Sequence, residues 1–275
     1  MQAAPRPGPR NLITDVAGIL VGNAEAPEYA SGTTVVLPEA PAIAAADVRG
    51  GGPGTRELDA IGPDAFNQVA HAVVLSGGSA YGLAAADGVM EVLRDRRIGL
   101  ALLDALVPIV PTAILFDLPL AADPSAAGSP LPYRALGQAA LGNASTDFAL
   151  GNAGAGLGAT TAEVKGGLGS VSLHDPDNGW TIGALAATNP RGSVLIPGTR
   201  HFRAALHEWG EEFGGLGLPG KAPHPFAAPA KGLRDAFTPH NTTLVVVATD
   251  AALNKAQARR VAIMAQDGIG LAIHP

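Results

Sequence analysis

The sequence has 275 residues, of which 36 are glycine, 23 are proline and none is cysteine. Hydrophobic residues make up 47% of the chain, which excludes a disordered protein and is enough for a large core. The net charge of −6 and the short, interrupted basic clusters exclude a nucleic-acid partner, because such proteins carry a concentrated basic face. Without cysteine, the chain has no disulfide, no catalytic thiol and no cysteine-based metal site.

No segment has the form of a targeting signal or a membrane span. Residues 1–10 are polar, with prolines and arginines and no apolar run behind them. The most apolar window, 98–116, contains Asp104, Pro108 and Pro111, which favour buried strands and turns over a membrane helix. We therefore expect a soluble, cytoplasmic protein with no membrane partner.

Short apolar runs alternate with glycine-rich turns in the first half of the chain. The predicted elements are a pair of strands over 12–22 around a turn at Ala17-Gly18, strands over 33–37 and 73–75, a helix over 79–95 and a loop over 121–134. Ser79 precedes the apolar stripe of the helix and is predicted as its N-cap.

The second half begins with a glycine-rich tract, 151–172, and then becomes more regular. It predicts strands over 181–188 and 193–196 around a turn at 189–192, a helix over 201–212, a surface segment over 214–240, a strand over 243–249 and a helix from an N-cap at Asp250 to about 267. Strands and helices alternate imperfectly and the turns between strands are short. This pattern favours a layered α+β domain over a doubly wound parallel sheet.

Two glycine motifs suggest phosphate chemistry. Gly154–Ala159 matches the loose dinucleotide pattern G-x-G-x-x-G/A, in which a tight turn brings backbone N–H groups to a pyrophosphate. No convincing strand precedes it, so an oxidoreductase using NAD is a weak alternative. Gly215–Lys221 begins like a phosphate-binding loop, but Ala222 stands where a serine or threonine is required, which excludes that interpretation.

Three further motifs have simple structural explanations. Residues 77–82 nearly form a nucleophile elbow, yet Tyr81 stands where a glycine is required, so a strand-to-helix turn is favoured. His201 and His207 are six positions apart, on different faces of a helix, which argues against a metal site. The densest glycine cluster, Gly50–Arg56, indicates either a sharp turn or a close approach to another group.

The most informative position is Thr242. It stands where a segment rich in proline and glycine ends at Asn241 and a strongly β-branched strand begins. If the bond between these residues is cut, Thr242 becomes an N-terminus held by a sheet. Its hydroxyl is then a nucleophile, and its own α-amine, with a pKa of about 8 in model peptides, is a nearby base. The alternative is an ordinary turn followed by a strand.

Together these residues identify a family resemblance that runs over nearly the whole chain. The chain resembles the self-processing N-terminal-nucleophile hydrolases that include the L-aminopeptidase/D-esterase, the β-peptidyl aminopeptidases and the nylon-oligomer hydrolase. The matching segments, in family order, are 13–22, 47–57, 74–83, 154–160, 165–170 and 241–249.

The resemblance implies a four-layer α/β/β/α sandwich in one domain, 1–275, which assembles into homo-oligomers. It implies self-cleavage between Asn241 and Thr242 into a large part, 1–241, and a small part, 242–275. The activity it implies is hydrolysis of amide bonds in small peptides or amide oligomers, with no metal and no cofactor. Thr242 corresponds to the nucleophile, and the side-chain amide of Asn189 to an oxyanion donor. A turn-forming role before a proline is an equal alternative for Asn189.

Some positions depart from the family pattern. Glu163 occupies the place of a lysine in the nylon-oligomer branch, with Lys165 two residues further on, and Phe116 replaces a tyrosine near the substrate. We assign these residues and Tyr81 to the substrate pocket. Relatives continue past the last helix into a strand with acidic residues, so we expect 242–275 to be a shortened small part. The alternative function is therefore a catalytically silent or truncated family member that acts as a structural or binding protein.

Overall fold

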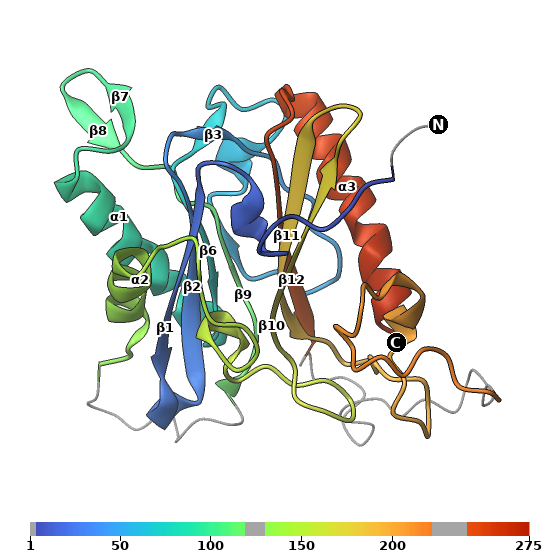
Figure 1. The fold of residues 1–275 in the computed structure, drawn as a ribbon. Helices are drawn as coiled ribbons and strands as arrows, with labels where there is room; N and C mark the ends of the chain where they lie inside the picture. Colours follow the sequence, from blue (N-terminus) through green and yellow to red (C-terminus); the bar gives the residue numbers. More distant parts are fainter. Residues whose placement is uncertain (1–3, 119–129, 222–240, 275) are drawn as a thin grey trace.

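The computed structural model describes residues 4–118, 130–221 and 241–274, and its fold is mixed α/β (Figure 1). A five-stranded sheet has the order β1-β2-β6-β9-β4, and a three-stranded sheet has the order β10-β11-β12. The strands of the first sheet are β1 (Ile19–Ala26), β2 (Ser31–Pro38), β6 (Val73–Ser76), β9 (Thr112–Ile114) and β4 (Thr55–Arg56). Those of the second are β10 (Gly167–Asp175), β11 (Trp180–Asn189) and β12 (Thr242–Thr249).

Neighbouring strands in both sheets are antiparallel, with the exception of the parallel pair β6 and β9. Two small ladders lie apart from the main sheets: β3 (Ala42–Ile43) with β5 (Val69–Ala70), and β7 (Leu100–Leu102) with β8 (Ala105–Val107). Helices α1 (Ala85–Asp95) and α2 (Tyr133–Gly142) lie beside the five-stranded sheet, and α3 (Lys255–Ala272) lies on the far side of the three-stranded sheet (Figure 1).

Two hydrophobic cores hold these elements together. In the first, the apolar stripe of α1, which includes Val89 and Leu93, packs with α2 against the five-stranded sheet. In the second, Leu185 of β11 packs with residues of the five-stranded sheet, so this core lies between the two sheets. Successive side chains of β2 point into different cores, since Val35 faces the helices and Val36 faces the other sheet.

Several predicted elements are confirmed. They are the strands over 33–37, 73–75, 181–188 and 243–249, which correspond to β2, β6, β11 and β12, and the helical region over 79–95, which is the 3₁₀ helix η4 (Ser79–Ala84) followed by α1. The predicted N-cap is wrong, because Gly78 holds that position and no side chain caps the helix. Ser79 instead has a left-handed backbone with φ 53°, and its N–H donates to the carbonyl of Leu115 at 3.0 Å.

Two predicted strands are wrong because side chains satisfy the backbone locally. Residues 12–16 do not form the first strand of a pair, since the carboxylate of Asp15 accepts from the N–H groups of Arg10 and Leu12 and closes a 3₁₀ helix, η1 (Ile13–Asp15). Residues 193–196 form two isolated bridges in place of a strand, Ser193 with His274 and Leu195 with Phe202, and the hydroxyl of Ser193 accepts from the N–H of Leu195.

The predicted helix over 201–212 is reduced to a 3₁₀ helix, η7 (Arg203–His207). The carboxylate of Glu208 accepts from the N–H groups of Phe213 and Gly215, which gives the backbone an alternative to helical hydrogen bonds. Of the predicted surface segment 214–240, residues 222–240 lie outside the described residues.

The last helix begins and ends later than predicted. Asn254, not Asp250, is its N-cap, in a capping box with Gln257, and the helix continues through Gly268 to Ala272. Asp250 accepts instead from the N–H of Thr181 at 2.7 Å and so ties the end of β12 to β11.

Helix α2 was not predicted. Its buried residues are spaced at i, i+3, i+4, i+7 and i+8, which is the helical pattern that the sequence offered: Tyr133, Leu136, Gly137, Ala140 and Leu141. The loop predicted over 121–134 is therefore wrong at its last two residues, and residues 121–129 lie outside the described residues. In the described ranges no helix is long and apolar enough to cross a membrane.

Candidate active site

The candidate site lies where β11 ends and β12 begins. Asn189 and Thr242 are the last pair of this antiparallel ladder, two residues beyond the pair Ala187 and Leu244. Because side chains alternate along a strand, both pairs share one face, and Ala187 and Leu244 belong to the core between the sheets. Thr242 therefore presents its hydroxyl on the inner face, directly across from the side chain of Asn189, at the distance of neighbouring residues in a ladder.

Asn189 is buried, and its side-chain amide is held from two sides. Its Oδ1 accepts from the backbone N–H of Thr160 at 3.0 Å, and its Nδ2 donates to the carbonyl of Phe116 at 3.0 Å. These bonds fix the plane of the amide and turn its NH₂ group toward the end of β9. The side chain of Asn189 is thus bonded to two segments that are distant in the chain, in addition to its place before Pro190.

The segment that receives this amide is itself fixed by Asp117. Asp117 is buried, and its Oδ1 accepts from the N–H of Gly78 at 2.7 Å. Burial raises the pKa of Asp117, and the hydrogen bond from Gly78 acts in the opposite direction. A side chain at Gly77 would meet Asp117 and Ser31, and Gly78 has a left-handed backbone with φ 86°. The two glycines thus permit the close packing at the carboxyl ends of β6 and β9.

A short hairpin over 160–165 forms another wall of the site. It is closed by the hydrogen bond from the N–H of Thr161 to the carbonyl of Val164 at 2.8 Å, and Thr160 is bridged to Lys165. The hairpin carries Glu163, whose Oε2 accepts from the buried hydroxyl of Ser193 at 2.6 Å.

The structure brings some of the predicted pocket residues together and leaves others apart. Asn189, Thr242 and the backbone of Phe116 meet at one point, and Glu163 reaches the loop that follows Asn189. Lys165 is exposed on the same hairpin. Tyr81 is 53% exposed on η4, and none of the hydrogen bonds described around Asn189 involves it.

Two contributors to the site, Thr160 and Asp117, were not predicted. Thr160 ends the segment 154–160 that carries the family resemblance, so its position in that motif was the available signal. Asp117 directly follows the apolar run that forms β9. A carboxylate placed immediately after a buried strand could have been identified as a side chain at a sheet end.

The backbone N–H groups of the dinucleotide motif already donate to other residues of the chain. Residues 154–156 form a 3₁₀ helix, η6 (Gly154–Gly156), and its residues are buried. The N–H of Gly154 donates to Glu25 at 2.6 Å, and the N–H of Ala155 donates to Thr34 at 3.0 Å. Since these backbone donors already have partners, they do not form a cradle for a pyrophosphate, and the oxidoreductase alternative is wrong.

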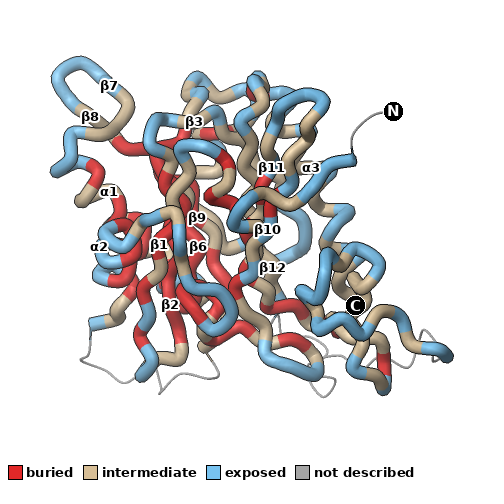
Figure 2. Tube along the Cα trace, in the orientation of Figure 1, coloured by how far each residue is buried: buried red, intermediate tan, exposed pale blue. Residues whose placement is uncertain are grey.

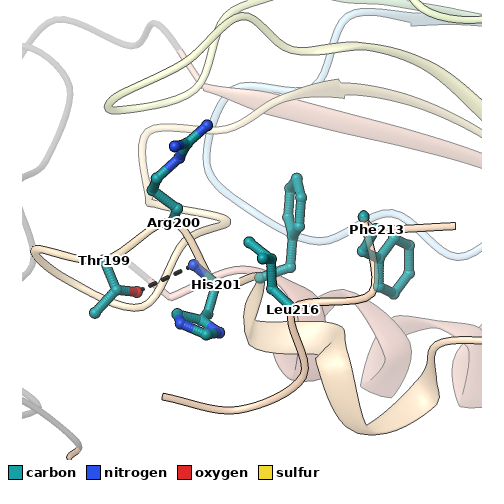
Figure 3. Close-up of a pocket in the computed structure, with 7 residues that line it drawn as sticks. Thr199, Arg200, His201, Phe213 and Leu216 are labelled. Carbon is teal, nitrogen blue, oxygen red and sulfur yellow. Dashed lines mark hydrogen bonds between the residues drawn. The ribbon is translucent and has the colours of Figure 1, made fainter. Parts of the chain in front are cut away.

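A groove lies in the segment 199–216, which follows Asn189 in the chain (Figure 3). Its volume is about 590 Å³, and it is lined by Thr199, Arg200, His201, Phe202, Phe213, Gly214 and Leu216. The rings of Phe202 and Phe213 pack with centroids 5.5 Å apart, and Nδ1 of His201 lies 2.9 Å from the carbonyl of Gly217. His201 therefore links this segment to the chain at Gly217. Within the described part of the chain no group of three or more His, Cys, Asp or Glu residues could hold a metal ion.

Comparison with solved structures defines the class of fold. The L-aminopeptidase D-Ala-esterase/amidase from Ochrobactrum anthropi, described as a variant of the Ntn hydrolase fold, aligns with a TM-score of 0.69 at 23% identity, over 99% of this chain and 72% of that chain. A β-aminopeptidase from Burkholderia sp. aligns with a TM-score of 0.68 at 23% identity, over 99% of this chain and 70% of that chain. The fold is thus that of the Ntn hydrolases.

Sequence comparison then gives the family. The model of peptidase family S58 matches residues 11–275, and the chain belongs to this family. An uncharacterized aminopeptidase of Mycobacterium tuberculosis is 41% identical over 96% of this chain and 77% of its own length. A 6-aminohexanoate-oligomer endohydrolase of Kocuria sp. is 35% identical over 57% of this chain and 41% of its own length. The protein is a hydrolytic enzyme, as the resemblance implied.

Proposed function

We propose that the protein is a self-processing amide hydrolase in which Thr242 is the nucleophile. The observation that carries this proposal is the pair formed by Asn189 and Thr242, the last pair of a ladder, on the inner face of the sheet. The pair combines a hydroxyl at the start of a strand with a buried amide whose orientation is fixed by Thr160 and Phe116. Family membership supports the same chemistry, because the family is one of peptidases.

The first reaction creates the active enzyme. The Thr242 hydroxyl attacks the carbonyl carbon of Asn241, the bond between this carbonyl and the nitrogen of Thr242 breaks, and the nitrogen leaves as a free amine. The resulting ester is hydrolysed by water, which releases the large part, 1–241, and leaves the small part, 242–275, with Thr242 at its N-terminus. Asn241 is exposed and Thr242 is held by the β12 ladder, an arrangement that supports attack from a fixed hydroxyl.

The second reaction uses the new amine as a base. It takes the proton from the Thr242 hydroxyl as the oxygen attacks the substrate amide, and it returns a proton to the leaving amine. The NH₂ group of Asn189 donates to the negative oxygen of the tetrahedral intermediate; such a donor contributes about 3 kcal/mol of barrier reduction. Water then hydrolyses the ester on Thr242, which restores the hydroxyl and the amine.

The proposed substrates are small peptides with a free amino end or linear amide oligomers. The names of the relatives support this class, since they include aminopeptidases and a hydrolase of 6-aminohexanoate oligomers. The proposed pocket residues are Glu163 and Lys165 on the 160–165 hairpin, and Phe116, whose carbonyl accepts from Asn189. Tyr81 stays a prediction for the outer rim of this pocket.

The same proposal includes the architecture and the setting of the enzyme. The order of helices, five-stranded sheet, three-stranded sheet and α3 in Figure 1 supports the four-layer α/β/β/α sandwich, in one domain over 1–275. Association into homo-oligomers and a cytoplasmic location also remain proposals, for which the resemblance and the composition are the support.

Replacement of Thr242 by alanine tests the proposal. We expect Thr242→Ala to stay as one polypeptide on denaturing electrophoresis, and its amide hydrolysis to fall at least about a thousand-fold, because the nucleophile is gone. Wild type should give two fragments, with N-terminal sequencing of the smaller one beginning at Thr242. The intact mass of the protein, measured before and after ageing, detects the same cleavage between Asn241 and Thr242.

Thr243→Ala is the matched control, because Thr243 is the next residue on β12 and lies on the opposite face of the sheet. We expect it to fragment like wild type and to keep its activity within about two-fold. Thr242→Ser should also fragment, since serine retains a hydroxyl. The proposal is contradicted if Thr242→Ala is still cut after residue 241 or still hydrolyses amides at the wild-type rate.

A further inference from the structure

The glycine run Gly50–Gly52 differs from the glycines that pack inside the fold. At Gly77 and Gly166 a side chain would collide with neighbouring groups, so the fold itself requires glycine there. At Gly50, Gly51 and Gly52 an added Cβ would meet no atom of the described structure within 4 Å, and among the three only Gly50 has a left-handed φ, of 100°. The folded chain therefore gives no steric reason for glycine at positions 51 and 52.

The run is held firmly at both ends. Before it, the carboxylate of Asp47 accepts from Arg259 of α3 at 3.1 Å, and Gln266 of the same helix donates to the carbonyl of Asp47 at 3.2 Å. After it, the carbonyl of Gly54 accepts from the N–H of Ile114 at 3.0 Å, and β4 continues the ladder with β9. Exposed backbone between two fixed ends is suited to contact with another molecule at little entropic cost.

The run lies at the end of the β4–β9 ladder from which β9 leads to the candidate active site. In the ladder of β4 with β9, Thr55 is opposite Ala113, and the hydrogen bond between Gly54 and Ile114 extends the ladder by one pair. Because β4 and β9 are antiparallel, the chain before Gly54 leaves the ladder at the end where β9 continues to Phe116, whose carbonyl accepts from the Asn189 amide. Because β4 is the last strand of its sheet, the side of this run away from β9 is not used by the sheet.

We propose that the backbone of Gly50–Pro53 is a substrate subsite that receives an extended amide chain, either a peptide or a linear amide oligomer, as it runs to Thr242. This inference rests on the proposed function. An amide chain presents alternating N–H and C=O groups, which pair with backbone groups at an unpaired edge. Glycine lets the two backbones approach without side chains between them.

The subsite predicts dependence on substrate length. A substrate with one amide bond occupies only the reacting centre, whereas a chain of several units also covers the glycine run. Side chains added at positions 51 and 52 should therefore weaken binding of long substrates, without affecting the fold or the self-cleavage. The effect should appear in KM, because the contact is made equally in the bound substrate and in the transition state.

The test compares Gly51→Ala and Gly52→Val with the control Gly169→Ala. Gly169 is exposed on β10 and, like Gly51 and Gly52, has open space around its Cα and an ordinary φ. Dimers and pentamers of alanine and of 6-aminohexanoate are the substrates, and the series that wild type hydrolyses is the one measured. We expect Gly52→Val to raise KM for the pentamer at least about five-fold and KM for the dimer less than about two-fold, with Gly51→Ala intermediate and Gly169→Ala unchanged.

Thermal unfolding and the fragment pattern separate the possible failures. Wild-type unfolding midpoints and complete self-cleavage in the variants show that the fold and the nucleophile are intact. When the fold and the self-cleavage are intact, three results overturn the subsite. They are an unchanged KM for the pentamer, an equal rise in KM for dimer and pentamer, and no hydrolysis of either substrate series by wild type. A shift in oligomeric state, measured by light scattering, also overturns it, because the run would then contact a second copy of the chain. Absence of the fragments in wild type instead overturns the proposed function.

Discussion

The two sides of the molecule are packed to very different degrees. The five-stranded sheet and the helices α1 and α2 contain most of the buried residues, whereas α3 and the outer face of the three-stranded sheet are largely exposed or half-buried (Figure 2). Five residues of α1 are buried, but in α3 only Lys255 is, and all eight residues of β12 are of intermediate exposure. The stability of the described structure therefore resides mainly in the half that contains β1, β2 and β6.

The candidate site lies where the two halves meet. Asn189 and Thr242 belong to the loosely covered sheet, and the backbone of Phe116 and the carboxylate of Asp117 belong to the well-packed half. A rigid side fixes the groups that orient the amide of Asn189, while the strand that carries Thr242 is the less protected partner. This division fits the proposed reaction, in which the chain before Thr242 is cut and then moves away from the nucleophile.

Removal of core volume in the well-packed half should give the largest effect. Leu93 of α1 is 0% exposed, and Leu93→Ala should lower the free energy of unfolding by about 2–5 kcal/mol, because it leaves a cavity that the sheet and α2 fill only in part. Urea unfolding followed by circular dichroism measures this loss.

Leu271→Ala is the matched control in α3, where the same side chain is 60% exposed. Its free energy of unfolding should stay within about 0.5 kcal/mol of wild type. Equal losses for the two variants would contradict the unequal packing of the two halves.

The same inequality explains which elements could be predicted from sequence. Strands β2, β6, β11 and β12 are short β-branched or apolar runs between turn residues, so local composition was enough to predict them. The failures at 12–16, 193–196 and 201–212 share a cause: Asp15, Ser193 and Glu208 bond nearby backbone groups. A sequence pattern does not show which of these polar side chains will turn back onto its own backbone.

The site was predicted in part, for a related reason. Thr242 and Asn189 each stand at a strand end beside turn residues, which local sequence makes visible, and the ladder then pairs them. Thr160, Phe116 and Asp117 contribute through backbone groups or through packing with glycines far away in the chain. These contacts join segments that are far apart in the chain, so the sequence indicates the residues at most and the structure is needed for their partners.

A smaller effect is expected from the N-cap of α3. Asn254 and Gln257 form two reciprocal hydrogen bonds of 2.9 Å, and Asn254→Ala should cost the helix about 1 kcal/mol. Because α3 is only lightly packed, we expect the loss as faster amide hydrogen exchange confined to 255–272, with little change in the global unfolding midpoint.

Asp250→Ala serves as the control for the cap, since Asp250 bonds β11 and does not cap α3. Its exchange should change near Thr181 and not in the first turn of α3. If Asn254→Ala lowers the global midpoint as far as Leu93→Ala does, α3 unfolds together with the core and the two halves are not energetically distinct.

The smallest expected effect comes from Asp117→Asn, which removes a charge at the junction of the halves and retains an oxygen to accept from Gly78. Burial raises the pKa of Asp117 in the folded protein above its unfolded value, so the folded state holds this proton more tightly. The carboxyl group's contribution to stability is then fully present below the unfolded pKa of about 3.9 and is lost as pH rises through the folded pKa. Asparagine cannot ionise, so Asp117→Asn should lose less stability than wild type as the pH rises from the unfolded pKa through the folded pKa of Asp117.

Unfolding midpoints measured from pH 4 to pH 8 check whether wild type loses stability relative to Asp117→Asn as the pH rises. The curves for wild type and Asp117→Asn should lie close together at the acid end and separate as pH rises, with the variant the more stable. Asp95→Asn at the end of α1 is the control variant, because the carboxylate that it removes is 69% exposed and belongs to a surface ion pair with Arg94. If the midpoints of wild type and Asp117→Asn change with pH in parallel, the junction tolerates a buried charge at no cost in stability. The segment that holds Asn189 would then be equally stable with Asp117 protonated or ionised.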